Sequence, residues 1–192
     1  MGVVWSDESP FVLRFYGRRR VWKRFGEGFV TSTTSGTVKH DAKLMVWGCF
    51  SAGGVGDLFC VSNLMNAASY KQILIHHLFP STRRLFPDNV FLFAQDNDPK
   101  HKSNVVQTFL HNKGTSVMEW PSYSPDLNPI ENLWAILDKQ LRARRCNTLD
   151  ELFKTLQNGW NNLQLKTLQS LVASMPARCQ AVIDANGYPT KY

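Results

Sequence analysis

The sequence predicts an α/β fold, and two observations support this class. Short apolar runs bounded by turn residues, as at 44–50 and 91–95, are typical of buried strands. Longer stretches at 65–78, 103–112 and 129–144 repeat their apolar residues at the helical period. The chain has 192 residues, which is enough for one domain with a substantial core.

Composition and charge limit the kinds of partner and structural site that we expect for this chain. The formal net charge is +7, which favours a polyanionic partner such as nucleic acid but also fits a generally basic soluble protein. The four cysteines are widely spaced and form no C-x-x-C pair, so we expect neither a structural zinc site nor a disulfide framework. Apolar runs stay well below the ~20 residues that a membrane-spanning helix needs, and we expect no membrane partner.

The N-terminal region combines a short strand with a basic loop. The apolar run Val3–Trp5 predicts a buried strand that ends at Asp7, and Phe11–Tyr16 predicts a second strand. A loop rich in Gly, Ser and Thr follows at 26–36. Two interpretations stay open for this region: a surface that tracks a DNA backbone and stacks on bases, or a solvated hairpin. Its candidate DNA contacts are Arg18, Arg19, Arg20, Lys23 and Arg24.

A hairpin is predicted next. The runs at 44–50 and 57–61 are separated by a glycine-rich turn at 51–56. No Gly-Lys-Ser/Thr sequence follows these glycines, so the turn is not a phosphate-binding P-loop and we expect no nucleotide cofactor.

The middle of the chain predicts helix, strand, helix and strand. The helix at 65–78 carries His76 and His77, which point in different directions and are a poor metal pair. The strand at 91–95 ends at Asp96, with Asp98 two residues later and Pro99 suited to a first helical turn. Two further elements follow: a helix at 103–112, with a core side of Val105, Val106, Phe109 and Leu110, and a short strand at 117–120.

A proline-rich loop at 121–129 leads into the longest predicted helix. Asn128 is a good N-cap, Pro129 a good first residue, and the helix is expected to run to about Arg144. Glu131 lies on the flank of its apolar stripe, where it can point into a cleft. Beyond it, a capping box at 148–151 opens two or three short amphipathic helices.

Three acids are therefore candidates for one site: Asp7, Asp96 and Glu131. Carboxylate oxygens are the ligands that Mg²⁺ prefers, and two such ions can activate a nucleophile and stabilise the leaving oxygen of a phosphodiester. Each acid also has a structural alternative: Glu131 can complete a capping box with Asn128, Asp96 can cap the next helix, and Asp7 can end a strand in a turn. Residue patterns alone leave both alternatives open.

A family resemblance favours the metal site. It rests on residues 4–9 (Val-Trp-Ser-Asp-Glu-Ser), 45–50, 95–101 and 120–134, the last of which is long and specific. These segments resemble the catalytic domain of Tc/mariner superfamily transposases, on the Tc side. The resemblance implies an RNase H-like fold with a mixed five-stranded sheet flanked by helices. It also implies a D,D,E triad with 34 residues between the second Asp and the Glu, which selects Asp96 over Asp98.

The same resemblance implies an activity and its partners. The expected reaction is metal-dependent cleavage and strand transfer of DNA in cut-and-paste transposition, with two Mg²⁺ ions for which Mn²⁺ can substitute. The expected partners are transposon ends, a TA target and a second copy of the chain, reached through a clamp-like loop at 11–37. Lys100, His101 and Lys102 are further candidate DNA contacts. The expected location is the nucleus, although no import signal is identified in the chain.

The expected domain limits follow from this resemblance. Residues 1–145 form the catalytic domain, and 146–192 form a C-terminal helical extension of the same domain. Transposases of this kind carry paired helix-turn-helix modules before the catalytic domain, and Met1 lies only six residues before Asp7, so we expect that module to be missing. The alternative function is a truncated or domesticated remnant that binds DNA or assembles without catalysis.

Overall fold

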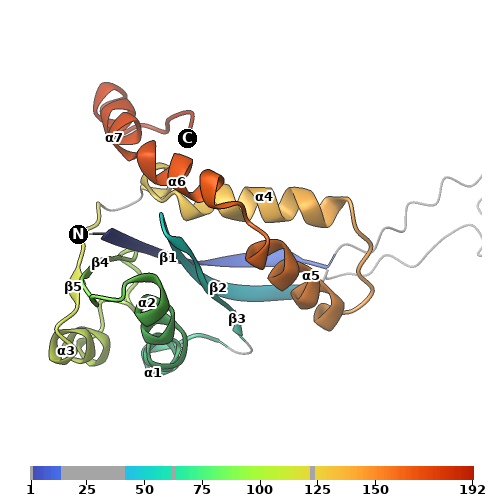
Figure 1. Cartoon of the computed structure of the whole chain (residues 1–192), viewed down its shortest axis with the longest axis horizontal. Helices are drawn as coiled ribbons and strands as arrows, with labels where there is room; N and C mark the ends of the chain where they lie inside the picture. The colour runs from blue at the N-terminus through green and yellow to red at the C-terminus, as the bar shows by residue number, and fades with distance from the viewer. Residues whose placement is uncertain (1, 14–41, 62–63, 122–123) are drawn as a thin grey trace, which may run out of the picture.

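The computed structural model describes residues 2–13, 42–61, 64–121 and 124–192, and within them a five-stranded mixed sheet forms the centre (Figure 1). The strand order is β3-β2-β1-β4-β5. The middle strand, β1 (Gly2–Val12), pairs antiparallel with β2 (Lys43–Ser51), which pairs antiparallel with β3 (Gly54–Val61). On its other side, β1 runs parallel to β4 (Phe91–Ala94), which runs parallel to β5 (Ser116–Val117).

Helices cover both faces of this sheet. One group is a continuous helical stretch made of α1 (Ala67–Ile73), a π-helical segment η1 (Leu74–Leu78) and α2 (Phe79–Leu85), accompanied by α3 (Asn104–Asn112). The other group follows a 3₁₀ turn, η2 (Pro125–Leu127), and consists of α4 (Ile130–Arg142), α5 (Leu149–Asn161), α6 (Leu165–Ala173) and α7 (Met175–Asp184). Figure 1 shows the two groups on opposite sides of the strands.

The two faces have separate cores because successive strand residues point to opposite sides. Val4 of β1 joins a core with α1, η1 and α3, in which Tyr70 and Phe93 are fully buried. Trp5 joins the other core, with α4, α5 and α6. By the same alternation, Asp7 faces the α4 side of the sheet.

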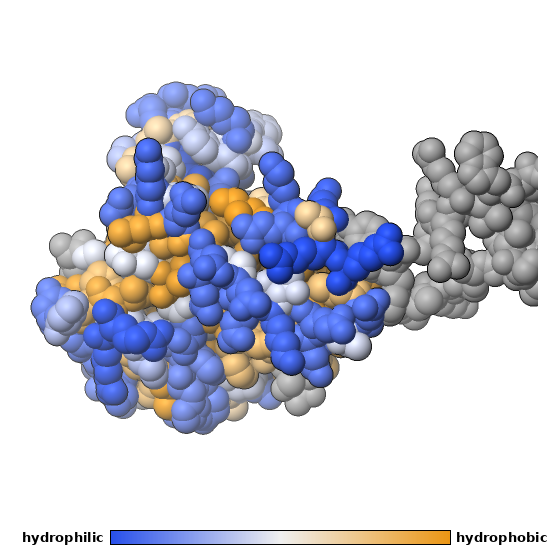
Figure 2. All heavy atoms as spheres, turned by 45° about the vertical axis from the view of Figure 1, so that its right-hand side comes forward, coloured by the Kyte–Doolittle hydropathy of each residue, from blue (hydrophilic) through white to orange (hydrophobic). Residues whose placement is uncertain are grey.

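The C-terminal helices belong to this second core. Trp160 of α5 stacks on Trp134 of α4 at a centroid distance of 5.1 Å, and its Nε1 donates to the Gly56 carbonyl at 2.9 Å. Gly48 makes room for this pair, since a Cβ there would lie 2.8 Å from the Trp134 ring. In Figure 2, hydrophobic residues form a band across the middle of the displayed face, below the uppermost lobe of C-terminal helices.

Most predicted elements are present, and the differences have local causes. β1 does not end at Asp7 but continues to Val12, since β2 pairs with it from Trp5 to Val12. Phe11 therefore belongs to the first strand, and residues 14–16 of the second predicted strand lie outside the described residues. The helix predicted to end at 78 continues to Leu85. The strand predicted at 117–120 has two residues, and Val105 is 52% exposed rather than in the core.

Most of the predicted basic loop lies outside the described residues. This holds for the basic residues from Arg18 to Arg24 and for most of the stretch at 11–37.

Within the described ranges, no helix is both long and apolar enough to cross a membrane.

Candidate active site

One cleft of about 450 Å³ brings the three predicted acids together. They reach it from separate elements: Asp7 from β1, Asp96 from the segment after β4, and Glu131 from the first turn of α4. The other residues that line the cleft are Asn97, Asp98, Pro99, Trp120, Pro121, Ser124, Pro125 and Asn128. The lining therefore combines four acids with three prolines and a tryptophan.

Asp7 is held inside the sheet. It pairs with Gly48 of β2, two residues beyond the point where the parallel pairing of β1 with β4 ends at Trp5 and Ala94. Its Oδ1 accepts the backbone N–H of Glu8 at 2.7 Å, and its Oδ2 accepts the side-chain amide of Asn128 at 3.0 Å. The acid thus has a fixed position because both its strand and its carboxylate are anchored.

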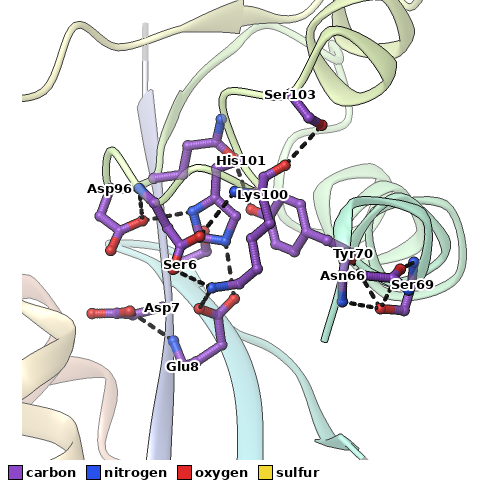
Figure 3. Close-up of polar contacts among 12 residues, drawn as sticks. Ser6, Asp7, Glu8, Asn66, Ser69, Tyr70, Asp96, Lys100, His101 and Ser103 are labelled. Carbon is purple, nitrogen blue, oxygen red and sulfur yellow. Dashed lines mark hydrogen bonds and ion pairs between the residues drawn. The ribbon is translucent and has the colours of Figure 1, made fainter. Parts of the chain in front are cut away.

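Asp96 leaves the sheet with the chain. It follows β4 by two residues, and its Oδ1 accepts the backbone N–H of Asp98 at 3.0 Å. The same oxygen lies 2.6 Å from Nδ1 of His101. The following helix is capped by Ser103, so Asp96 is not needed as its cap. In Figure 3, Asp7 and Asp96 point to the same side, away from Glu8 and Lys100.

His101 connects β1 with the segment that follows β4. Its side chain is 2% exposed, and its Nε2 lies 3.3 Å from Oε1 of Glu8, the neighbour of Asp7 on the opposite face of β1. Its ring packs on Tyr70 at a centroid distance of 4.0 Å. Lys100 extends the network by pairing with Glu8 at 3.7 Å (Figure 3). It also pairs with Asp98.

Glu131 reaches the cleft because the η2 turn and Pro129 set the start of α4. The predicted capping box is not formed: the backbone N–H of Asn128 donates to the carbonyl of Pro125 at 2.8 Å, while the Asn128 side chain serves Asp7 and Ile130. The Glu131 side chain is left exposed at the mouth of the cleft. Its carboxyl is therefore available to a ligand.

The electrostatics of the three acids differ. Burial and, after it, the negative charges of Glu131, Glu8 and Asp96 raise the pKa of Asp7 to about 8, against the backbone hydrogen bond from Glu8 that lowers it. Partial burial also raises the pKa of Glu131. The hydrogen bond from His101 lowers the pKa of Asp96. Burial would lower the pKa of His101, but Asp96 and Glu8 raise it to about 9, so this imidazole is a cation at neutral pH.

These carboxylates fit a divalent cation by their chemistry. Mg²⁺ and Mn²⁺ prefer oxygen ligands, and a cation would stabilise the ionised form of Asp7 against the burial and the neighbouring negative charges that raise its pKa. Within the described part of the chain, no three His, Cys, Asp or Glu side chains stand close enough together to hold a metal ion as they are placed. The three acids share the cleft, and a cation would have to draw their carboxylates closer together.

A buried arginine holds the segment of chain that carries Glu131. Arg178 of α7 is 2% exposed, and its guanidinium donates to the carbonyl of Asp126 at 2.9 Å and to Oδ1 of Asn132 at 2.5 Å. Its Nε donates to Ser174 at 2.9 Å. Because Asp126 and Asn132 flank Glu131 in sequence, this side chain fixes the segment that presents the acid.

Sequence reasoning identified some of these residues and missed others. His101 was grouped with Lys100 and Lys102 as a DNA contact, but its side chain is buried against two carboxylates, whereas Lys102 is exposed. Asn128 was expected only to cap a helix. The roles of Glu8 and Arg178 were missed, since their partners lie far away in sequence; an acid next to Asp7 was the only local signal for Glu8.

Comparisons with known proteins agree with this geometry. A family model described as "DDE superfamily endonuclease" matches residues 2–153. The chain is 41% identical over 196 residues to the Tc1 transposase of Caenorhabditis elegans and 39% identical over 191 residues to the Tcb1 transposase of Caenorhabditis briggsae; each alignment covers 98% of this chain and 70% of the relative. The Tc3 transposase of Caenorhabditis elegans is 34% identical over 197 residues, covering 99% of this chain and 58% of that protein.

Solved structures show the same fold. The Mos1 transposase in a paired-end complex with the left transposon end superposes with a TM-score of 0.81 at 22% identity, covering 98% of this chain and 56% of that one. The crystal structure of the catalytic domain of Mos1 mariner transposase superposes with a TM-score of 0.77 at 21% identity, covering 98% and 84%. The chain thus spans a little over half of the longer Mos1 protein and most of its catalytic domain, and the RNase H-like fold is confirmed.

Proposed function

The chain belongs to the DDE superfamily of endonucleases, among the relatives of the Tc1 transposase, and from that premise we propose that it cleaves and joins DNA strands with the help of divalent metal ions. The relatives are transposases, so the reaction that this catalytic domain serves is cut-and-paste DNA transposition. Its substrates are a transposon end and a target site, and the TA target is part of the proposal.

One observation carries the proposal: Asp7, Asp96 and Glu131 come from three separate elements and line the same cleft. They are the residues that match the family's D,D,E pattern. Burial raises the pKa of Asp7, and the negative charges of Glu131, Glu8 and Asp96 add to that rise, so keeping an ionised Asp7 beside these acids costs free energy. A site that keeps such an arrangement is suited to a cation.

In this proposal each acid is a ligand, and the surrounding residues position it. A bound pair of Mg²⁺ or Mn²⁺ ions would supply an activated nucleophile and would stabilise the leaving oxygen. Asn128 and the Glu8 amide fix the two oxygens of Asp7. His101 occupies one oxygen of Asp96 and leaves the other free to face the cleft. Solved Mos1 structures with Mg and with Mn support the choice of ions.

The partners follow from the same premise. A paired-end complex of Mos1 contains transposon-end DNA, which supports a DNA substrate for this cleft. Lys102 is exposed and directly follows His101, and in this proposal it contacts a phosphate of the bound DNA. Dimer formation through the 11–37 loop is part of the proposal.

The test is a nicking assay on supercoiled DNA with Mg²⁺ or Mn²⁺. We expect Glu131→Gln to abolish metal-dependent nicking, because the amide keeps the shape of the side chain but loses its charge. Glu119→Gln is the matched control, since Glu119 is an exposed acid that does not line the cleft. Thermal unfolding of both variants verifies that each is folded.

The same assay distinguishes the proposed function from the alternative, a non-catalytic remnant that binds DNA. A non-catalytic remnant would bind DNA with an affinity that falls steeply with salt, and it would show no metal-dependent nicking. Nicking that is equal in wild type and Glu131→Gln would contradict the assignment of the acids. Titration calorimetry with Mn²⁺ adds an independent readout, in which heat of binding is expected for wild type and much less for Glu131→Gln.

A further inference from the structure

The lining of the cleft includes apolar residues that the metal chemistry does not use. Pro99, Trp120, Pro121 and Pro125 line it together with the acids. A phosphodiester and its metal ions are bound by charged and polar groups, and they gain nothing from contact with an indole ring. A nucleobase, in contrast, has a flat apolar face that stacks on aromatic side chains. These apolar residues therefore suit the base of the nucleotide rather than its phosphate.

The cleft has room for a single base. Its volume of about 450 Å³ falls in the range of sites that enclose one small molecule. A base can stack on a ring inside such a cleft only when it is unpaired or extruded from its own stack. Enzymes that act inside DNA commonly offer the extruded base an aromatic or apolar surface, which offsets part of the cost of unstacking.

Trp120 is held in a defined place next to the acids. Its backbone carbonyl accepts the side-chain amide of Asn97 at 2.7 Å, and two residues earlier the N–H of Met118 donates to the carbonyl of Phe93 at 2.7 Å. Asn97 directly follows Asp96. The backbone of Trp120 is thereby tied to the segment that carries one of the candidate metal ligands.

The indole ring of Trp120 is braced and still has a free surface. It meets the buried ring of Trp5 in a T-shaped contact, with centroids 5.9 Å apart and planes at 76°. A T-shaped contact uses the edge of one ring and one face of the other, so at least one face of Trp120 is left uncovered by Trp5. Trp5 lies two residues before Asp7 on β1, and therefore on the same face of the sheet.

We propose that Trp120 is a stacking platform for an unpaired nucleobase that flanks the phosphodiester bound at Asp7, Asp96 and Glu131. The proposal rests on the proposed function and adds a binding subsite to it. The ligand class is any DNA base, because stacking on an aromatic ring tolerates all four. The subsite selects for unpaired DNA beside the site of cleavage and carries no sequence preference of its own.

The test compares two DNA probes in EDTA, so that binding is measured without cleavage. One probe is a short duplex with a single-stranded 3′ overhang, and the other has abasic sites in place of the overhang bases. Dissociation constants are measured by fluorescence anisotropy at fixed salt. Wild type is expected to bind the base-bearing probe roughly 5- to 150-fold more tightly than the abasic probe, as one stacked base allows.

Variants of Trp120 test whether the preference for the base-bearing probe depends on its ring. Trp120→Ala is expected to bring the ratio of the two dissociation constants close to one, whereas Trp120→Phe keeps most of the preference because it retains a ring. Tyr188→Ala is the matched control, since Tyr188 is 75% exposed and does not line the cleft. An unchanged ratio in Trp120→Ala, or a ratio near one in wild type, would overturn the proposal. Loss of nicking in Glu131→Gln is independent of this result, so the two proposals can fail separately.

Discussion

The side-chain amide of Asn128 donates a 3.0 Å hydrogen bond to the Asp7 carboxylate, joining residues 121 positions apart in the sequence. Asn128 is 6% exposed and also accepts the backbone N–H of Ile130, at 3.4 Å. One side chain thus connects the central strand to the start of α4, whose first turn carries Glu131. The spacing between two of the candidate metal ligands depends on this link.

Replacement of Asn128 tests that link. We expect Asn128→Ala to lower the free energy of unfolding by about 1–3 kcal/mol, because a buried hydrogen bond is lost and Asp7 is left with one partner fewer. Asn128→Asp should destabilise the metal-free chain more, since it adds an acid beside Asp7, and Mn²⁺ should restore more stability to this variant than to Asn128→Ala. Urea unfolding with and without Mn²⁺ measures both effects; equal recovery in the two variants would contradict the account.

The raised pKa of Asp7 predicts a pH dependence of stability. The ordinary pKa is 3.8 and the folded value is about 8, so between these limits the unfolded chain releases a proton that the folded chain keeps. The metal-free chain should therefore lose stability as pH rises from about 4 to about 8, by up to about 1.4 kcal/mol per pH unit. His101 acts in the same direction above pH 6.5, since its folded pKa is about 9.

Asp7→Asn is the variant that checks this slope. Urea unfolding in EDTA at several pH values between 4 and 5.5 avoids most of the titration of His101, whose ordinary pKa is 6.5. Glu131, whose pKa is also raised, acts in the same direction and is present in both proteins. The variant should show a flatter dependence than wild type. A slope equal to that of wild type would mean that Asp7 is ionised in the folded chain across this range.

His101 bridges Glu8 and Asp96, so we expect the effects of substituting these residues on stability to be strongly coupled. His101→Ala should lower stability by about 1–3 kcal/mol, less than for a fully buried ion pair, because the side chain of Asp96 is 45% exposed. Glu8→Gln removes the charge on the other side, where the side chain is only 11% exposed. A double-mutant cycle of these two changes should give an interaction energy above about 0.5 kcal/mol, whereas independent residues would give additive losses.

The buried guanidinium of Arg178 is expected to stabilise the fold through its hydrogen bonds. Arg178→Ala should lower stability by about 2–4 kcal/mol, because it leaves the Asp126 carbonyl and the Asn132 side chain without their partner in the interior. Arg142 is the matched control, as it lies on the surface and pairs with Asp138 four residues earlier. Arg142→Ala should cost at most about 0.5 kcal/mol. Similar losses in the two variants would contradict the structural role of Arg178.

The sequence predicted the parts of this molecule that depend on local patterns. The strands at 44–50 and 91–94 and the helix that begins beside Pro129 were found from apolar runs, periodicity and capping residues. Asp96 was found because a buried strand ended in an acid. That Asp7, Asp96 and Glu131 share a cleft followed from family resemblance, since residue patterns could not decide how the strands are ordered.

What could not be predicted depends on contacts between distant segments. β1 was expected to end at the acid, but pairing with β2 carries it on to Val12, and that pairing has no local signal. His101 was predicted to be a DNA contact together with Lys100 and Lys102, but its side chain is buried. Its burial follows from Glu8 and Tyr70, which belong to other elements and supply a charge and a ring surface.

The contact of Arg178 with the turn before Glu131 also has a consequence during protein synthesis. The three acids have all left the ribosome before α7 is made, because Arg178 follows Glu131 by 47 residues. A nascent chain at that stage holds every candidate metal ligand but lacks the side chain that fixes the third one in place. The carboxylate site is thus completed late, when the helices that cover the sheet have been translated, and a ribosome-bound fragment would have the acids without their final arrangement.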